Sequence, residues 1–229
     1  MSDLVAQKQA VASAALKYVA RGEVLGVGTG STVDEFINLL GSKLEGVVST
    51  AVSSSKASTI RLRELGIETV TLDAVDRIGV YVDGADEFNS DLALIKGGGA
   101  ALTGEKIVAS VSELFVCIVD GSKRVDTLGC FPLPVEVLPM AQGPVMRGLK
   151  ALGGNPVLRD GIVTDHGNLV VDVHDLRIED PAALEVEIET TPGVVTCGIF
   201  ARRRADVVIV SSSADVVETL TCGPGVQQR

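Results

Sequence analysis

Short, almost entirely apolar segments alternate with amphipathic segments along the first half of the chain, and this alternation constrains the fold most. Strands are expected at 24–28, 47–52, 68–72, 78–84 and 114–120, and helices at 4–19, after Ser31 or Thr32, up to Leu65 and at 106–114. Strands that are apolar on both faces form parallel sheets covered by helices on both sides. The sequence therefore predicts an α/β fold with a Rossmann-like parallel sheet covered by helices.

The helix after the first strand is the clearest single element. Val33, Phe36, Ile37 and Leu40 have the spacing of one buried helix face. A hydroxyl of Ser31 or Thr32 is expected to cap its N-terminus. The loop 53–59 is expected to precede the next helix, which Gly66 ends.

The alternation stops at the proline-containing segment 129–139. Beyond it the expected order is strand (135–138), helix (142–152), strands (156–159 and 169–173), a helix after Asp180 and Pro181, and a strand (194–200). This is the ferredoxin-like α+β order. Segment 206–213 is again a buried type of strand and should rejoin the first sheet, whereas residues 221–229 are predicted to be unstructured. We expect one domain of residues 1–130 plus 205–229 and a smaller domain of residues 131–204.

The charge balance excludes several classes of partner. The chain of 229 residues has 20 Lys and Arg against 30 Asp and Glu, a net charge of −10, and its only basic run is 202–204. An acidic surface repels nucleic acid and anionic membranes. No apolar run approaches the roughly 20 residues that span a bilayer. We therefore expect neither a nucleic-acid partner nor membrane insertion.

The cysteines predict neither a metal site nor a disulfide framework. Cys117, Cys130, Cys197 and Cys222 stand far apart, without a CxxC pair. Buried free thiols in a reducing, cytoplasmic setting are the expected interpretation.

Two candidate ligand segments follow predicted strands, where open α/β sheets bind their ligands. GVGTGSTV (26–33) has glycines and a helix start suited to an anion, but it matches neither the P-loop nor GxGxxG, so a small phosphate ester is favoured over a nucleotide. An ordinary tight turn explains it equally well. In YVDGADEFN (81–89), Asp83, Asp86 and Glu87 could bind a divalent cation, bind sugar hydroxyls or cap the next element, and hydroxyl binding is favoured.

The other two segments bring lysines, glycine amides and a carboxylate. In IKGGGAALTGEKIVAS (95–110), Lys96 and the glycines 97–99 suit a developing oxyanion, and Glu105 is either a solvated first-turn carboxylate or a base. Lys123, in DGSKRVD (120–126), is either a surface lysine or a phosphate ligand. His166 and His174 are expected at the surface, so a proton carrier should be a carboxylate.

These segments, together with VSSSKAST, TLGCFPLPVEVLPMA, GVVT and ADVVIV, resemble the type A ribose-5-phosphate isomerases from about residue 5 to residue 217. The resemblance implies a metal-free and cofactor-free aldose-ketose isomerase of the pentose phosphate pathway that acts on ribose 5-phosphate and ribulose 5-phosphate. It also implies a homodimer or tetramer. The substrate ligands that it implies are Thr29, Gly30, Ser31, Thr32, Asp83, Gly84, Ala85, Asp86, Lys96, Gly97, Gly98, Gly99 and Lys123.

The resemblance makes Glu105 the base that moves a proton between C2 and C1 through a cis-enediolate. Lys96 and the glycine amides would stabilise the enediolate, and Asp83 or Asp86 would assist ring opening. Gly104 departs from the family pattern, which often has arginine beside the base. Two alternatives stay open at this point: a non-catalytic sugar-phosphate sensor, and a magnesium-dependent phosphatase or sugar kinase that uses the acids of DGADE.

Overall fold

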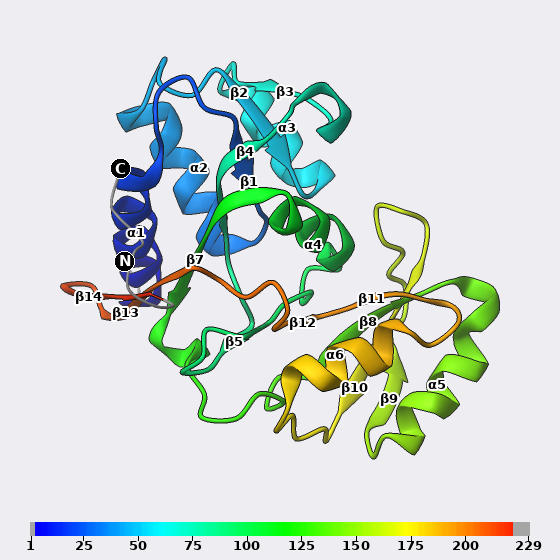
Figure 1. The fold of residues 1–229 in the computed structure, drawn as a ribbon. Helices are drawn as coiled ribbons and strands as arrows, with labels where there is room; N and C mark the ends of the chain where they lie inside the picture. The colour runs from blue at the N-terminus through cyan, green and yellow to red at the C-terminus, as the bar shows by residue number, and fades with distance from the viewer. Residues whose placement is uncertain (1–2, 222–229) are drawn as a thin grey trace. The chain divides into compact units, whose positions relative to one another are not determined.

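A computed structural model describes residues 3–221, which divide into two compact units (Figure 1). Among these residues, unit 1 holds 3–84, 104–123 and 205–221, and unit 2 holds 85–103 and 124–204. The chain thus passes from one unit to the other at four peptide bonds, after Gly84, Thr103, Lys123 and Arg204. The division into a domain of residues 1–130 plus 205–229 and a domain of residues 131–204 stays a prediction.

Unit 1 is built on a seven-stranded sheet in the order β14-β13-β7-β4-β1-β2-β3. All neighbours pair in parallel except β13 and β14. The α/β fold with a mainly parallel sheet is confirmed, and segment 206–213 rejoins this sheet as β13. The strands are β1 (Leu25–Val27), β2 (Thr50–Ser53), β3 (Glu68–Thr69), β4 (Ile78–Asp83), β7 (Ser112–Asp120), β13 (Val207–Ser213) and β14 (Val216–Thr221).

Helices α1 (Asp3–Ala15) and α2 (Ser31–Lys43) pack against each other, and both bury their apolar faces in the core of unit 1. The four apolar residues predicted for α2 are all buried. The predicted hydroxyl cap is wrong, because Gly30 is the N-cap residue and no side chain caps α2. Ser31 is the first helical residue, and its hydroxyl instead accepts a hydrogen bond from the Lys8 ammonium at 2.8 Å.

Helices α3 (Lys56–Glu64) and α4 (Leu102–Ser110) have bounds that differ from the expectation. The loop expected at 53–59 ends early, because the Ser55 hydroxyl accepts from the Ser58 amide at 3.2 Å and caps α3. The helix expected at 106–114 begins at Leu102 and stops at Ser110, since Ser112 already pairs with Ile78 of β4 in the sheet.

The two faces of β4 have different neighbours, as the alternation of side chains in a strand requires. Val80 and Val82 belong to the core that contains α1 and α2. Tyr81 points to the other face, where its ring lies 5.1 Å from that of Phe115. Short 3-10 helices follow α1 (Leu16–Tyr18), β3 (Leu72–Ala74) and β7 (η3, Gly121–Lys123).

Unit 2 contains a four-stranded antiparallel sheet in the order β11-β8-β10-β9. Its elements follow one another as β8 (Leu133–Val137), a 3-10 turn (Pro139–Ala141), α5 (Gln142–Ala151), β9 (Asn155–Leu158), β10 (Leu169–His174), α6 (Pro181–Glu189) and β11 (Val194–Cys197). This confirms the ferredoxin-like α+β prediction. The Asp180 side chain caps α6 by accepting from the Ala183 amide at 3.1 Å, as the Asp-Pro start indicated.

The single strand expected at 194–200 is two strands, because Gly198 interrupts it. β12 (Ile199–Phe200) leaves the four-stranded sheet and joins β6 (Leu94–Ile95) and β5 (Glu87–Phe88) in a three-stranded one. A Cβ on Gly198 would lie 2.2 Å from the Lys96 carbonyl oxygen, so only glycine allows this crossing. Strands β5, β6 and β14 were not expected from the sequence.

A fully buried carboxylate, Glu136 on β8, connects three segments of unit 2. It accepts hydrogen bonds from the Thr103 hydroxyl at 2.5 Å, the Thr164 hydroxyl at 2.8 Å and the Asn168 amide at 2.8 Å. A buried charge is tolerated only when such donors surround it. Glu136 therefore fixes residue 103, where the chain leaves unit 2, to the centre of the four-stranded sheet.

We predict that Glu136→Ala lowers the free energy of unfolding by about 3 kcal/mol, because three buried donors lose their acceptor. Urea denaturation measures this change. The control is Glu64→Ala at an exposed position of α3, which should change stability by less than about 0.5 kcal/mol. Equal effects of the two substitutions would contradict the role of Glu136.

Candidate active site

Asp83, at the end of β4, joins the first two candidate segments within unit 1. Its side chain is 0% exposed. One carboxylate oxygen accepts from the Thr29 amide at 3.1 Å and the Gly84 amide at 2.7 Å, and the other accepts from the Tyr81 hydroxyl. A Cβ on Gly28 would lie 1.9 Å from this carboxylate, so the close approach requires glycine. The loops after β1 and β4 are therefore held together by a buried anion.

The carboxyl ends of neighbouring parallel strands bring further predicted residues to one edge of this sheet. β7, β4 and β1 are adjacent, and Lys123, Asp83 and Thr29 follow or end them. Thr29, Thr32 and Lys123 are half-buried, and Gly30 and Ser31 are exposed. The start of α2 points its first amides toward this edge, an arrangement that binds phosphate groups.

Glu105 lies in the first turn of α4 and is 3% exposed. The interpretation as a solvated first-turn carboxylate is therefore wrong. Burial raises the pKa of Tyr81 well above its ordinary value of 10.0, and the negative charges of Asp83 and then Glu105 raise it further. Tyr81 is thus a neutral hydroxyl group held close to two acids.

Gly104 explains how α4 comes so close to the loop after β2. A Cβ at this position would lie 2.3 Å from the Ser54 carbonyl oxygen, which is a backbone atom and cannot rotate away. Any larger residue here would require the backbone of α4 or of the loop after β2 to shift. The missing side chain therefore sets the position of the first turn of α4, which includes Glu105.

We predict that Gly104→Ala destabilises the protein by about 1–3 kcal/mol, because the added methyl group collides with backbone. Gly148→Ala in α5 is the matched control, since nothing lies within 4 Å of a Cβ at that position. It should stabilise the protein by about 0.5–1 kcal/mol through helix propensity. Thermal unfolding of both variants checks the opposite signs, and stabilisation by both would contradict the close packing at Gly104.

The raised pKa of Tyr81 predicts a pH dependence of stability. As the pH rises above 10.0, unfolded Tyr81 loses its proton before folded Tyr81, so its contribution to stability is lost above that pH and constant below it. Tyr81→Phe should therefore reduce the loss of stability in alkali, measured by urea unfolding at a series of pH values.

Absorbance of tyrosinate checks the same prediction directly, because the chain has two tyrosines and no tryptophan. Tyr81→Phe should remove the rise in tyrosinate absorbance that occurs at the highest pH. Tyr18→Phe is the control and should leave that rise, although burial also raises the pKa of Tyr18. A rise at the highest pH that survives in Tyr81→Phe would contradict the assignment.

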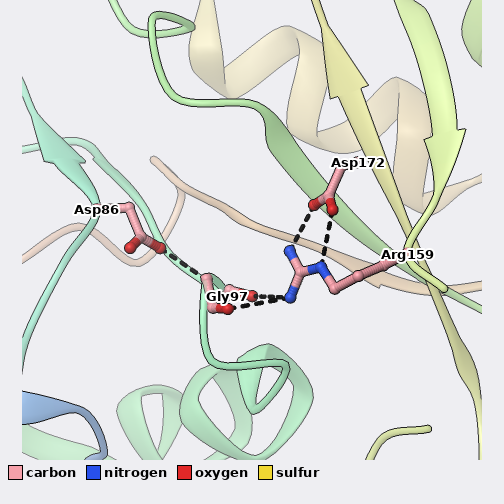
Figure 2. Close-up of polar contacts among 5 residues, drawn as sticks. Asp86, Gly97, Arg159 and Asp172 are labelled. Carbon is pink, nitrogen blue, oxygen red and sulfur yellow. Dashed lines mark hydrogen bonds and ion pairs between the residues drawn. The ribbon is translucent and has the colours of Figure 1, made fainter. Parts of the chain in front are cut away.

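In unit 2, Asp86 and the triple-glycine loop lie together (Figure 2). The Gly98 amide donates to the Asp86 carboxylate at 2.8 Å, and a Cβ on Gly98 would lie 2.6 Å from an oxygen of that carboxylate. Gly97 has a φ of 106°, a conformation that favours glycine. Gly98 and Gly99 are exposed, whereas Gly84, Ala85 and Asp86 are half-buried.

Lys96 is 2% exposed, and its ammonium lies 5.6 Å from the centre of the Phe200 ring. Its amide donates to the Gly198 carbonyl at 2.9 Å. Such burial is unusual for lysine. Lys96 is therefore part of the interior of unit 2 and not a surface residue.

Glu87 does not belong with the other acids of its segment. Its carboxylate accepts from the Gly129 amide at 2.8 Å and from the Phe131 amide, so it fixes the segment before β8. In the described part of the chain, no group of three or more His, Cys, Asp or Glu side chains is arranged to hold a metal ion. His166 is exposed and His174 half-buried.

The cysteines agree in part with the expectation. Cys117 and Cys197 are buried free thiols, whereas Cys130 is exposed, because it lies in the turn before β8 and not within a strand. Cys222 lies outside the described residues. None of the helices within residues 3–221 is both long and apolar enough to cross a membrane.

Sequence reasoning missed Tyr81, Arg159 and Asp172. Tyr81 had a usable signal, since it is the one residue with a hydroxyl in an otherwise apolar strand that ends in Asp83. Arg159 and Asp172 had none, because they lie in the second half of the chain, far in sequence from every candidate segment. Arg159 contacts the triple-glycine loop, and Asp172 contacts Arg159, as Figure 2 shows.

Comparison with known proteins identifies the family of this chain. The family model for ribose 5-phosphate isomerase A (phosphoriboisomerase A) matches residues 50–215. The chain is 46% identical to ribose 5-phosphate isomerase A from Neisseria gonorrhoeae, with a TM-score of 0.94 and coverage of 97% of this chain and 99% of that one. It is 41% identical to the enzyme from Methanocaldococcus jannaschii, with a TM-score of 0.89 and coverage of 94% and 98%.

A third similar structure is a D-ribose-5-phosphate isomerase in complex with phospho-erythronic acid. It is 41% identical, with a TM-score of 0.90 and coverage of 94% of this chain and 97% of that one. The family model and the similar structures together cover both units of the chain. This chain therefore belongs to the ribose 5-phosphate isomerase A family and is an isomerase.

Proposed function

We propose that this enzyme interconverts D-ribose 5-phosphate and D-ribulose 5-phosphate through a cis-enediolate, with Glu105 as the base. The observation that carries the proposal is the placement of Glu105, a carboxylate buried in the first turn of α4 and near enough to Tyr81 for its charge to raise the pKa of that hydroxyl. A buried carboxylate in an ordered setting is the type of group that abstracts a proton next to a carbonyl.

The proposed reaction needs one base for two proton transfers. Glu105 removes the proton from C2 of the open-chain aldose, the C–H electrons form the C1–C2 double bond, and the aldehyde oxygen takes up negative charge. O1 then gains a proton while the C2 hydroxyl loses one. Glu105 returns its proton to C1, where the electrons of the C1–C2 double bond form the new C–H bond. A lone pair of the deprotonated O2 forms the carbonyl at C2, and the carboxylate is regenerated.

We assign the phosphate group to the loop of Thr29, Gly30, Ser31 and Thr32, with Lys123 as a further cation. Support comes from the missing side-chain cap at α2, because Gly30 leaves the first amides of this helix to another acceptor. A phosphate at this position also benefits from the helix dipole. Lys123 follows β7, a strand adjacent to β4 in the same sheet.

We assign the developing negative charge on the substrate to Lys96 and to the amides of the triple-glycine loop. The Gly98 amide already donates to Asp86, so the amides of Gly97 and Gly99 are the donors in this proposal. Charged and preorganised donors of this kind are worth about 10²–10³ in rate.

The two aspartates receive different roles. Asp86 is half-buried and assists ring opening and proton movement between O1 and O2, with Gly84 and Ala85 as neighbouring ligands. Asp83 is fully buried and accepts three hydrogen bonds, so its part is to hold the two loops of unit 1. The burial of Asp83 distinguishes it from Asp86.

The structure with phospho-erythronic acid supports the enediolate route. That compound combines a planar, anionic carboxylate with a phosphorylated polyol chain, and a cis-enediolate has the same planarity and charge. Compounds that resemble a transition state bind more tightly than substrates. We therefore expect phospho-erythronic acid to bind this chain as well. A homodimer or tetramer, a cytoplasmic location and the independence from cofactors stay predictions.

We predict that Glu105→Gln lowers kcat at least about 100-fold, because the amide cannot accept the proton. The substitution keeps the size of the side chain, so phospho-erythronic acid should still bind. The measurements are ketose formation from ribose 5-phosphate, deuterium incorporation from solvent, and calorimetric titration with phospho-erythronic acid.

Glu113→Gln is the control, since Glu113 lies in a surface ion pair with Arg77 and should leave kcat unchanged. Near-normal turnover of Glu105→Gln would refute the base assignment. All assays contain a chelator, and activity lost on chelation, or phosphate released from the substrate, would favour the magnesium-dependent alternative. Binding of ribose 5-phosphate by the wild type without ketose formation would favour the sensor.

A further inference from the structure

Arg159 connects the ferredoxin-like sheet to the triple-glycine loop inside unit 2 (Figure 2). It follows β9, and its Nε and Nη2 donate to the two carboxylate oxygens of Asp172 on β10, at 2.7 and 2.5 Å. Its Nη1 donates to the carbonyl oxygens of Gly97 at 3.2 Å and Gly98 at 3.0 Å. One guanidinium thus binds a carboxylate on one edge and two successive backbone carbonyls on the other.

The contact fixes the orientation of two peptide groups. In a planar trans peptide, the carbonyl of one residue and the amide of the next point in opposite directions. Holding the Gly97 carbonyl therefore aims the Gly98 amide away from Arg159, and that amide donates to Asp86. Holding the Gly98 carbonyl likewise aims the Gly99 amide away from Arg159.

Glycine gives such an anchor a purpose. Gly97, Gly98 and Gly99 have no Cβ to restrict their dihedral angles. The Ala100 amide donates to the Gly97 carbonyl at 2.9 Å within the turn, and Arg159 adds a second donor there and one at the Gly98 carbonyl. An amide that stabilises an oxyanion must be oriented before the charge develops. Arg159 restricts the loop through its carbonyl oxygens and does not contact the N–H groups that would face the substrate.

We propose that Arg159, held by Asp172, is a positioning residue for the isomerase reaction. It keeps the carbonyl side of the triple-glycine loop fixed, so that the Gly98 amide holds Asp86 and the Gly99 amide faces the substrate. This inference rests on the proposed role of the loop as an oxyanion donor. It gives the ferredoxin-like sheet a part in the reaction although none of its strands carries a proposed catalytic group.

The chemistry of arginine suits this task better than that of lysine. The guanidinium is planar and presents its donors in a rigid fork, so a bidentate carboxylate on one edge dictates where the remaining N–H groups point. Arg159 and Asp172 have side chains that are each only 18% exposed. Their interaction is therefore screened less by water than that of an ordinary surface pair.

The test compares Arg159→Gln, Arg159→Lys and Asp172→Asn with the wild type. Arg159→Gln should lower kcat about 10- to 100-fold, as expected for a misplaced catalytic group. The change in KM should be smaller than the change in kcat, or absent. Arg159→Lys should restore part of kcat, and Asp172→Asn should lower it. Hydrogen exchange of the peptide that contains residues 97–99 should be faster in Arg159→Gln, which reports the loop without using activity.

The control is Arg177→Gln, which removes a guanidinium from an exposed ion pair with Glu179 in the same unit. It should leave kcat and the loop exchange unchanged. Unchanged kcat or unchanged loop exchange in Arg159→Gln overturns the proposal, and Asp172→Asn provides the same readouts should Arg159→Gln fail to fold. Normal turnover of Glu105→Gln would refute only the assignment of Glu105 as the base. The hydrogen-exchange result for Arg159→Gln tests the positioning role of Arg159 independently of that assignment.

Discussion

Buried carboxylates that accept backbone amides are the interaction on which this structure depends. Asp83 binds the amides of Thr29 and Gly84, Glu87 binds those of Gly129 and Phe131, and Glu185 binds those of Ala201 and Arg202. Each places an anion where irregular backbone would otherwise bury unpaired N–H groups. The loops next to the sheets can therefore be both buried and ordered without regular secondary structure.

Glycine is the second requirement for these buried and ordered loops, because close approach of backbone requires the absence of a side chain. Gly28 admits Asp83, Gly104 admits the Ser54 carbonyl, and Gly198 admits the Lys96 carbonyl. At the triple-glycine loop the same freedom would leave the amides without a fixed direction, and Arg159 restricts it from the carbonyl side. Each unit thus combines permissive glycine backbone with specific polar anchors.

Several elements could be predicted from local patterns, and the errors have local causes. The buried face of α2 follows from the 3.6-residue period, and the order of unit 2 follows from its turn residues. The cap of α2 was wrong because Gly30 takes that position. Strands β5, β6 and β12 have two residues each, too short for any periodicity. The pairing of β12 with β6 also joins segments far apart in sequence, where Gly198 allows the close approach to the Lys96 carbonyl.

The sequence alone determined the α/β and ferredoxin-like architecture, the candidate segments and the family resemblance, because hydrophobic period, turn residues and motif spacing are local properties. Only the tertiary structure decided that Glu105 is buried, that Asp83 holds two loops while Asp86 binds the glycine loop, and that Glu87 serves the fold. It alone connected Arg159 to Gly97 across 62 residues of sequence. Burial and long-range hydrogen bonds depend on how strands are ordered in a sheet, and no local pattern encodes that order.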